Sequence, residues 1–348
     1  MTSVLIFRRG SIGDAVVSVP ALNAIAKTHP GAERWILTNI PVMETAAAIE
    51  DVLKNSMLVQ GYINLPRGGG GWAEIRAAID KIRALKPECL YYLSEPSGFL
   101  AHLKERAFFR LCGVHTVIGA PGAPDTATYR RLETGLWESE TARLLRVIGA
   151  ESPHIPDWTF AFTPAERKEA DAALAGWLAP DRYVLFSVGA KLPDKDWGDA
   201  NWFQVLDRIS TASPGLGLVA IGAADESART QRMLAAWHGP TLNLCGRTAP
   251  RISALMGAGA SFYLGHDSGP MHLAALVGCP CVAIFSARAK PGVWFPRGDN
   301  NRIFYPWDAE PAVPARTGFR VAGTSITTIQ PEPVVAACLE LLATSAHT

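Results

Sequence analysis

Short apolar runs alternate with amphipathic stretches along most of the chain. The apolar run at 4–7 leads into a glycine-containing turn, and apolar residues then recur at helical spacing as far as His29. Residues 35–38 form the next apolar run. We therefore predict a strand, a turn, a helix and a second strand, which is the βαβ unit of a parallel sheet.

The same alternation extends through both halves of the chain. We predict further strands at 57–59, 63–65, 89–93, 183–187, 216–221, 241–244, 262–264 and 281–285. We predict further helices at 72–85, 99–111, 200–210, 228–237, 252–256, 271–277 and 333–343. Strands that alternate with helices in this way imply two doubly wound α/β domains.

A shift in composition marks the boundary between the two halves. Four prolines, at 153, 156, 164 and 180, interrupt the region from about 149 to 183, which holds one helical stretch. We predict an N-terminal domain at 1–160, a linker region at 161–182, a second domain at 183–330 and a closing helix at 331–348. The 348 residues of the chain suffice for two domains of ordinary size.

The composition is that of an ordinary packed protein without an excess of charge. Lys and Arg number 33 against 32 Asp and Glu, which leaves a net charge of +1. A nucleic-acid binder normally carries a basic excess, so we expect no nucleic-acid partner. None of the six cysteines forms a Cys-x-x-Cys pair, and we expect reduced, buried cysteines rather than disulfides or zinc ligands.

The longest uncharged apolar tract, at 268–287, is long enough to cross a bilayer as a helix. Pro270 and a Gly-Cys-Pro turn at 278–280 interrupt it, so we predict a helix, a turn and a buried strand instead. The apolar run at 4–7 is too short for a signal peptide and runs directly into two arginines. These features favour a cytoplasmic protein.

In a parallel α/β sheet, ligands bind where the carboxyl ends of strands lead into helices, so polar residues in those turns are the candidates for chemistry. The first turn, Ser-Ile-Gly-Asp at 11–14, lacks the Gly-x-Gly-x-x-Gly pattern of dinucleotide-binding domains. Asp14 is either a helix cap for free backbone N–H groups or a general base that deprotonates an acceptor hydroxyl. Spacing alone favours the cap.

The turn Gly-His-Asp-Ser-Gly-Pro-Met-His at 265–272 lies between a predicted strand and a predicted helix. The free N–H groups of Ser268 and Gly269, together with the helix dipole, suit a diphosphate. His272 lies about one turn further on, where it would add a hydrogen bond or a positive charge. Asp267 is typical of a helix cap and is also placed to orient ligand-binding groups.

Two further turns carry candidate ligand-binding charges. After the strand at 183–187, Lys191 and Lys195 are placed to neutralise a departing diphosphate, although solvated loop lysines are the commoner outcome. After the strand at 216–221, Glu226 is placed to accept hydrogen bonds from ribose hydroxyls. Acidic residues also favour the first turn of a helix, so this carboxylate alone is a weak signal.

In order and spacing, these segments resemble glycosyltransferase family 9, the ADP-heptose:lipopolysaccharide heptosyltransferases. The most specific stretch is Asp-Ser-Gly-Pro-Met-His-Leu-Ala-Ala at 267–275. It is accompanied by Val-Leu-Ile-Phe-Arg at 4–8, Ser-Ile-Gly-Asp at 11–14, Pro-Ala-Leu at 20–22, Asp-Lys-Asp-Trp at 194–197, Trp-Phe at 202–203, Gly-Cys-Pro at 278–280 and Ala-Ile-Phe at 283–285. Together these segments extend over most of the chain.

The resemblance implies an α/β GT-B fold, in which two Rossmann-like doubly wound domains face a central cleft, the first binding the acceptor and the second the nucleotide sugar. It implies an inverting, metal-independent transfer of heptose from ADP-heptose to an acceptor hydroxyl, without a cofactor. The acceptor that it implies is a lipopolysaccharide inner core, a related glycan or a lipid-linked saccharide. Such an enzyme works in the cytoplasm, with or without peripheral contact to the inner face of the cytoplasmic membrane.

Matching positions imply a role for each candidate residue. Asp14 is the expected general base, and Lys195 is the group expected to neutralise departing ADP. The expected donor-binding residues are Ser187, Gly189, Lys191, Glu226, Asp267, Ser268, Gly269 and His272. The expected acceptor-binding residues are Arg8, Arg9, Ser11 and Arg67, and no metal ligand is expected. Arg130 and Arg131 are further cations for an anionic acceptor, but all of these arginines are equally compatible with a solvated surface.

The sequence leaves three alternatives open. A nucleotide-sugar epimerase shares the two-domain architecture and would act on a nucleotide sugar without an acceptor. A glycosyltransferase of the same fold could use another nucleotide sugar or a small-molecule acceptor. A non-catalytic nucleotide-binding protein would use Asp14 and Asp267 only as helix caps.

Overall fold

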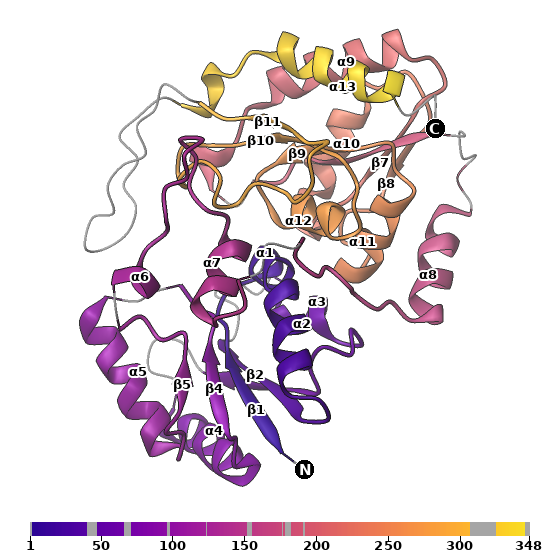
Figure 1. Ribbon diagram of the computed structural model, residues 1–348. Coiled ribbons are helices and arrows are strands. Elements are labelled where there is room, and N and C mark those ends of the chain that lie inside the picture. The colour runs from indigo at the N-terminus through magenta and orange to yellow at the C-terminus, as the bar shows by residue number, and fades with distance from the viewer. Residues whose placement is uncertain are drawn as a thin grey trace. The chain divides into compact units, whose positions relative to one another are not determined.

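The computed structural model describes residues 2–39, 47–65, 71–95, 98–122, 124–151, 155–175, 177, 182–190, 192–306 and 325–344. The chain divides into two compact units, Met1–Phe162 and Thr163–Thr348. Each unit is built on one parallel β-sheet with helices packed against it (Figure 1). The prediction of two doubly wound α/β domains is therefore confirmed.

The first unit contains a five-stranded parallel sheet in the order β3-β2-β1-β4-β5. Its strands are β1 Ser3–Phe7, β2 Glu33–Asn39, β3 Gly61–Leu65, β4 Cys89–Tyr92 and β5 Val117–Ile118. The central strand β1 is buried along its whole length, and its last residue, Phe7, pairs with Leu37 and Tyr92 on either side. The turn after Phe7 therefore begins at the carboxyl edge of the sheet, between the ends of two neighbouring strands.

Helices connect these strands. They are α1 Ile12–Val17, α2 Val19–Thr28, α3 Ile49–Leu53, α4 Trp72–Leu85, α5 Phe99–Leu111, α6 Pro124–Ala127 and α7 Glu140–Val147. Helices α4 and α5 confirm the predictions at 72–85 and 99–111. Apolar side chains at helical spacing, Ala78 and Ile82 of α4, pack with Phe109 of α5 against the core of the sheet.

Two local predictions differ from the structure. The helix expected as far as His29 is divided into α1 and α2, because Pro20 lies in the first turn of α2 and has no N–H for an intrahelical hydrogen bond. The strand expected at 57–59 is a turn. Met57 has a left-handed backbone with a φ of 65°, and Arg34 Nε donates to the carbonyl of Leu58 at 2.7 Å.

The second unit contains a six-stranded parallel sheet in the order β11-β10-β9-β6-β7-β8. Its strands are β6 Tyr183–Ser187, β7 Gly217–Ala220, β8 Thr241–Asn243, β9 Tyr263–His266, β10 Cys281–Ile284 and β11 Arg302–Phe304. Ser187, the last residue of β6, pairs with Gly265 of β9. The turns after β6 and β9 therefore begin side by side.

Helices pack on both faces of this second sheet. They are α8 Pro164–Leu174, α9 Asp199–Ala212, α10 Ser227–Leu234, α11 Pro250–Ala258, α12 Gly269–Leu276 and α13 Pro331–Thr344, with 3-10 turns η1 Pro193–Lys195, η2 Ala224–Glu226 and η3 Ile326–Thr328. The uncharged tract at 268–287 forms α12, a turn and β10, as predicted. No helix among the described residues has the length and apolar character needed to span a membrane.

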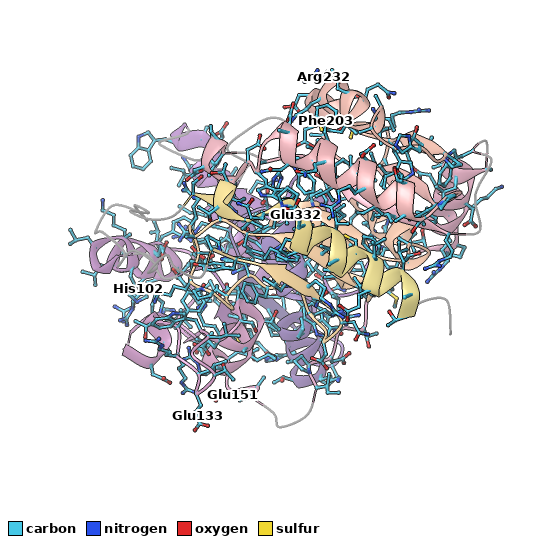
Figure 2. All side chains as sticks on the ribbon, turned by 90° about the horizontal axis from the view of Figure 1, so that it is seen from above. His102, Glu133, Glu151, Phe203, Arg232 and Glu332 are labelled. Carbon is cyan, nitrogen blue, oxygen red and sulfur yellow. The ribbon has the colours of Figure 1, made fainter. Side chains whose placement is uncertain are left out.

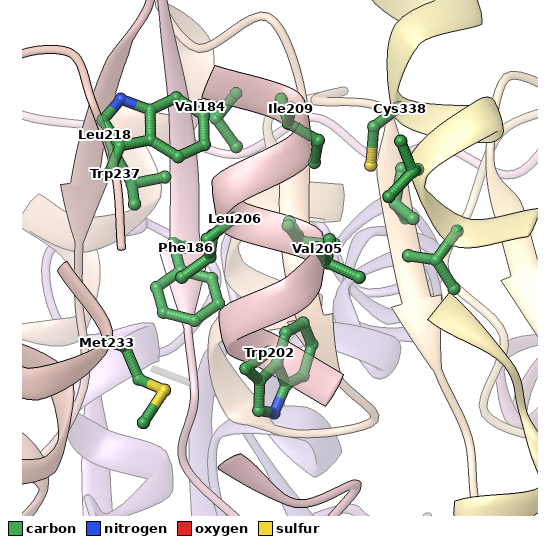
Figure 3. Close-up of a cluster of buried hydrophobic side chains, with 14 of the residues drawn as sticks. Val184, Phe186, Trp202, Val205, Leu206, Ile209, Leu218, Met233, Trp237 and Cys338 are labelled. Carbon is green, nitrogen blue, oxygen red and sulfur yellow. The ribbon is translucent and has the colours of Figure 1, made fainter. Parts of the chain in front are cut away.

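The second unit has two buried clusters, one between its sheet and the helices α9 and α13, and one between the sheet and the helices α8, α11 and α12. Trp202, Val205 and Leu206 of α9 pack over Phe186 of β6 (Figure 3), and Cys338 of α13 joins the same cluster. The two helices are also joined at the surface, where Arg208 and Glu332 form an ion pair at 3.0 Å (Figure 2, which labels the glutamate). All six cysteines are buried with free thiols, as predicted.

Candidate functional site

In the first unit, the turn after β1 holds Asp14 in a defined position. The backbone N–H of Ser11 donates to Asp14 Oδ2 at 2.9 Å, so this carboxylate does cap the first turn of α1. Gly10 makes room for it, since a Cβ at that residue would lie 2.0 Å from Asp14 Cγ. The Asp14 side chain nevertheless stays 22% exposed. Capping and access to a substrate are therefore compatible at Asp14.

Arg8 lies beneath this turn, and only 1% of its surface is exposed. Its Nη2 is 3.2 Å from Asp14 Oδ1, and its Nε donates to the backbone carbonyl of the same residue at 3.2 Å. Its Nη1 donates to the carbonyl of Leu93, which follows β4, at 2.5 Å. The guanidinium thus faces Asp14 and the sheet edge, where it orients the carboxylate.

A second buried carboxylate balances the charge of Arg8. Glu140 begins α7 and is fully buried, with Oε1 2.8 Å from Arg8 Nη1 and Oε2 2.7 Å from Arg143 Nε. Tyr129 donates its hydroxyl to Oε2 at 2.9 Å. Burial opposes ionisation, but the hydrogen bonds from Arg143 and Arg8 and their charges hold the pKa of Glu140 below its ordinary value.

The remaining predicted acceptor residues lie on the same edge or outside the described residues. Arg9 is 38% exposed and forms an ion pair with Glu105 of α5 at 3.1 Å. Arg67 lies outside the described residues.

Glu95, which the motifs do not indicate, follows β4 and reaches solvent. Partial desolvation and the negative charges of Glu140 and Asp14 raise the pKa of Glu95.

In the second unit, the turn between β9 and α12 gathers three of the predicted residues. Lys195 Nζ is 2.8 Å from Asp267 Oδ2 and 3.3 Å from the carbonyl of the same aspartate. His272 Nε2 lies 3.9 Å from Asp267 Oδ1. Ser268 is the N-cap residue and Gly269 begins α12, so free N–H groups of the helix start lie beside this charged cluster.

Glu226 is the last residue of η2, which follows the neighbouring strand β7, and two glycines make room for its side chain. Its Oε2 accepts from the N–H of Ala223 at 2.8 Å. A Cβ at Gly189 would lie 1.9 Å from Glu226 Oε1, and a Cβ at Gly222 would lie 2.3 Å from Oε2. The position of the carboxylate therefore depends on both glycines. Gly189, predicted as a donor-binding residue, lies directly beside Glu226, and its contact with the donor stays a prediction. Lys191 lies outside the described residues.

Three buried hydroxyls lie beneath these turns. Those of Ser187, Tyr263 and Ser268 form no hydrogen bond of regular geometry with other described residues, but both serine hydroxyls lie close enough to the Tyr263 hydroxyl to act on its pKa. The three hydroxyls therefore form one buried polar group beside these turns. Burial also raises the pKa of Tyr263, so its hydroxyl stays protonated and available as a donor. The tyrosine was not indicated by the sequence, because a tyrosine inside a strand is typical of a core position.

An Asp-x-Asp triplet at 194–196 lies in the same region, and such a triplet is the usual motif of metal-dependent transferases. Asp194 pairs with Arg288 at 2.6 Å. Asp196 pairs with both terminal nitrogens of Arg229, at 2.7 and 2.9 Å. Each carboxylate thus has a cationic partner, and no group of three or more potential ligands for a metal ion occurs among the described residues.

Comparison with known sequences identifies relatives of this chain. The family model described as glycosyltransferase family 9 (heptosyltransferase) matches residues 141–316, about half of the chain. Lipopolysaccharide heptosyltransferase 3 of Escherichia coli is 25% identical over 213 residues. This match includes 60% of the chain but spans only 57% of the length of that curated relative.

Solved structures with the same fold extend over nearly the whole chain. A glycosyltransferase family 9 protein from Veillonella parvula has a TM-score of 0.75 at 16% identity, with 98% of this chain and 97% of that chain covered. ADP-heptose lps heptosyltransferase II of Escherichia coli has a TM-score of 0.70 at 18% identity, with 99% and 100% covered. These likenesses confirm the predicted GT-B fold class, two Rossmann-like domains.

Proposed function

Because the chain belongs to glycosyltransferase family 9, we propose that it transfers heptose from ADP-heptose to a hydroxyl of a lipopolysaccharide inner-core acceptor, with inversion. The observation that carries the proposal is the cluster of Lys195, Asp267 and His272 beside the start of α12. The names of two relatives, a lipopolysaccharide heptosyltransferase and an ADP-heptose heptosyltransferase, support this choice of donor and acceptor.

The donor diphosphate binds at the start of α12 in this proposal. The free N–H groups of Ser268 and Gly269 and the positive end of the helix dipole favour an anion there. The hydroxyls of Ser187 and Ser268, which lie beside that of Tyr263, donate to phosphate oxygens. Glu226 accepts hydrogen bonds from the ribose hydroxyls. Lys195 offsets the negative charge that develops on departing ADP, so the reaction requires neither a metal ion nor a cofactor.

Asp14 is the general base of the proposed single displacement. The acceptor oxygen bonds to the anomeric carbon of heptose while the bond from that carbon to the diphosphate oxygen breaks. The hydroxyl proton passes to Asp14, and the bonding electron pair leaves with ADP. Arg8, which faces Asp14 from below, holds the carboxylate in place, and its burial favours this role over direct contact with the acceptor.

Acceptor binding uses the exposed polar residues near Asp14. Arg9 has an exposed guanidinium that suits a phosphorylated or carboxylated sugar, and Ser11 lies beside it at the same turn. We include Arg67 in this set on the family resemblance. A lipid-linked saccharide of this kind is presented at the inner face of the cytoplasmic membrane, which is where we propose that the protein acts.

A donor and acceptor assay tests the function. ADP-heptose mixed with phosphorylated inner-core saccharides should yield ADP and a heptosylated product of inverted anomeric configuration. The epimerase alternative predicts an isomerised nucleotide sugar in the absence of acceptor, and a non-catalytic protein predicts ADP binding without turnover. If ADP-heptose is not consumed with any anionic glycan while another nucleotide sugar is, the proposed donor is wrong.

A further inference from the structure

One buried imidazole contacts both ends of the connection that carries Lys195. This connection runs from β6 to α9, with Gly189 near its beginning and Trp197 near its end. The backbone N–H of Trp197 is 3.0 Å from His266 Nε2, and the carbonyl of Gly189 is 3.3 Å from His266 Nδ1. The ring belongs to the last residue of β9, so the sheet itself anchors both contacts.

The chemistry of these partners defines the state of the ring. A backbone N–H only donates, so Nε2 of His266 must carry a lone pair. A backbone carbonyl only accepts, so Nδ1 must carry the proton. The ring is therefore neutral, in the Nδ1–H form. Burial lowers the pKa of His266 to about 4, which keeps the ring in this form near neutral pH.

The end of the connection is fixed at several further points around Trp197. This residue is fully buried, and its indole N–H donates to the carbonyl of Ile329 at 2.8 Å. Its ring packs edge-on against Trp202 of α9, with 4.9 Å between ring centroids. The neighbouring Asp196 is held by two nitrogens of Arg229 from α10. Lys195 therefore directly precedes a rigid segment.

Lys195 and His266 are linked through the strand end as well. Asp267, which holds the Lys195 ammonium at 2.8 Å, is the residue that follows His266. The end of β9 and its turn therefore hold Lys195 in two ways. Asp267 binds the ammonium of Lys195, and His266 binds the backbone of the segment that carries the lysine. Two consecutive side chains of β9 and its turn determine where the ammonium lies relative to the start of α12.

A buried histidine is more often a core residue whose ring nitrogens simply find partners. His266 does pack against Trp202, with 5.0 Å between ring centroids, as a core residue would. Packing alone, however, does not require a hydrogen bond from either ring nitrogen. The use of both nitrogens, on two segments that are distant in sequence from the ring and on either side of Lys195, is what a positioning role requires.

We propose that His266 is a positioning residue, which joins Gly189 to Trp197 and so places Lys195 against the departing diphosphate. This inference rests on the proposed function, because it assigns the ammonium to the leaving group. Charged side chains that contact the reacting groups support catalysis only when surrounding hydrogen bonds fix their positions. Loss of the ring nitrogens should therefore affect the rate of transfer more than the binding of ADP-heptose.

Three substitutions separate shape from hydrogen bonding. His266→Phe keeps a flat ring but neither nitrogen. His266→Asn keeps an amide donor near Nδ1 for Gly189, and His266→Gln keeps an oxygen acceptor near Nε2 for Trp197. His238→Phe is the control, because His238 is an exposed imidazole paired with Asp207 at the surface. We expect kcat for heptose transfer to fall about 10- to 100-fold in the Phe and Asn variants, with a smaller change in KM for ADP-heptose.

Hydrogen exchange gives a readout that is independent of activity. The Trp197 amide should be protected in the native protein and in His266→Gln, and should exchange at least about tenfold faster in the Phe and Asn variants. His238→Phe should match the native protein in both measurements. Unchanged exchange at Trp197 together with an unchanged kcat in His266→Phe would show that the ring only packs, and would overturn the proposal.

A measurement on the native protein covers the case in which the variants do not fold. In ¹⁵N-labelled protein, the ring signals of His266 should show a protonated Nδ1 and an unprotonated Nε2 at neutral pH. The opposite tautomer would overturn the proposal. If the native protein binds ADP but transfers no heptose, the proposed function fails, while the exchange of Trp197 and the tautomer still decide whether His266 joins the two segments.

Discussion

The carboxylate of Asp14 can serve both as a helix cap and as a general base. One oxygen accepts from the Ser11 N–H and the other faces Arg8, while the side chain keeps access to solvent. The residue pattern alone favours a cap, and the structure contains that cap. The resemblance at 11–14 implies a general base as the second role, and that is the role we propose. The two roles can be separated experimentally, because an amide oxygen caps a helix but does not take up a proton.

We expect Asp14→Asn to remain folded but lose turnover. Its amide oxygen still accepts from Ser11, and Arg8 retains Glu140, so the free energy of unfolding should fall by only about 1–2 kcal/mol. The transfer rate should fall at least about 100-fold, with ADP affinity unchanged. Asp51→Asn is the control, since Asp51 Oδ2 caps α3 in the same way, 2.8 Å from the N–H of Ala48. Full activity in Asp14→Asn would refute the base assignment.

Glu140 is the residue on which the charge balance below Asp14 depends. Glu140→Gln should leave the buried cations Arg8 and Arg143 without their shared anion, and should lower the free energy of unfolding by about 3–5 kcal/mol. Glu332→Gln removes an exposed partner of Arg208 and should cost less than about 1 kcal/mol. Urea unfolding of both variants measures the difference. Equal effects would mean that the buried network does not depend on ionised Glu140.

His266 should make stability depend on pH below neutrality. Its pKa is about 4 in the folded protein, whereas an unfolded histidine titrates near 6.5. Between these values the unfolded chain binds a proton that the folded chain does not. The free energy of unfolding should therefore decrease as the pH falls from about 6.5 to about 4, by about 3 kcal/mol at most. The charged groups that act on the ring are Asp196, Arg229 and Lys195.

Urea unfolding at pH 6.5 and pH 4.5 checks this dependence. Carboxylates also titrate near the lower pH, so the informative quantity is the difference between the native protein and His266→Asn. The variant should lose less stability over this interval than the native protein. An equal loss in both would show that the folded ring is protonated as readily as an unfolded one.

At the scale of elements, the sequence predicts best those helices and strands that depend on residues close together along the chain. Apolar spacing predicts α4, and proline with a Gly-Cys-Pro turn predicts α12 and β10. The break at Ser18 and the turn at Met57 depend on backbone detail that periodicity does not contain.

Parallel strand topology also predicts that the turns carrying Lys195 and Asp267 lie at one edge of the sheet, but not that the two side chains form an ion pair. Contacts that join distant segments through side chains were not predictable. Arg8 meets Glu140 across 132 positions, and His266 meets Trp197 and Gly189 across 69 and 77. No local pattern marks those pairs, since a buried ion pair and a buried imidazole need partners that only the fold brings near.

The glycine turns at the strand ends provide a test at this scale. Gly189→Ala would place a Cβ 1.9 Å from Glu226 Oε1 and should displace that carboxylate. ADP affinity should fall about tenfold through weakened contacts with the ribose, as expected for loss of one charge-assisted hydrogen bond. Gly71→Ala is the control, because a Cβ there meets nothing within 4 Å. Calorimetric titration with ADP measures both, and unchanged affinity in Gly189→Ala would argue against a ribose role for Glu226.

At the scale of the whole molecule, the proposed roles divide between the two compact units. Every proposed donor residue belongs to Thr163–Thr348, and every proposed acceptor residue, with Asp14, belongs to Met1–Phe162. The family match covers 141–316, so it includes the donor turns but not Asp14. The assignment of the base therefore depends more on local geometry and resemblance than the donor site does.

Nucleotide binding tests this division directly, because a ligand that binds one native unit slows local opening there. Saturating ADP should slow hydrogen exchange in the turns after β6, β7 and β9, most of all around Ser268 and Gly269. Exchange around Gly10 and Asp14 should stay unchanged with ADP alone. Glu226→Gln, which weakens the proposed ribose contact, should require more ADP for the same protection. Protection centred on Gly10–Asp14 instead would assign the nucleotide to the first unit, and Lys195 would then lose its proposed role at the leaving group.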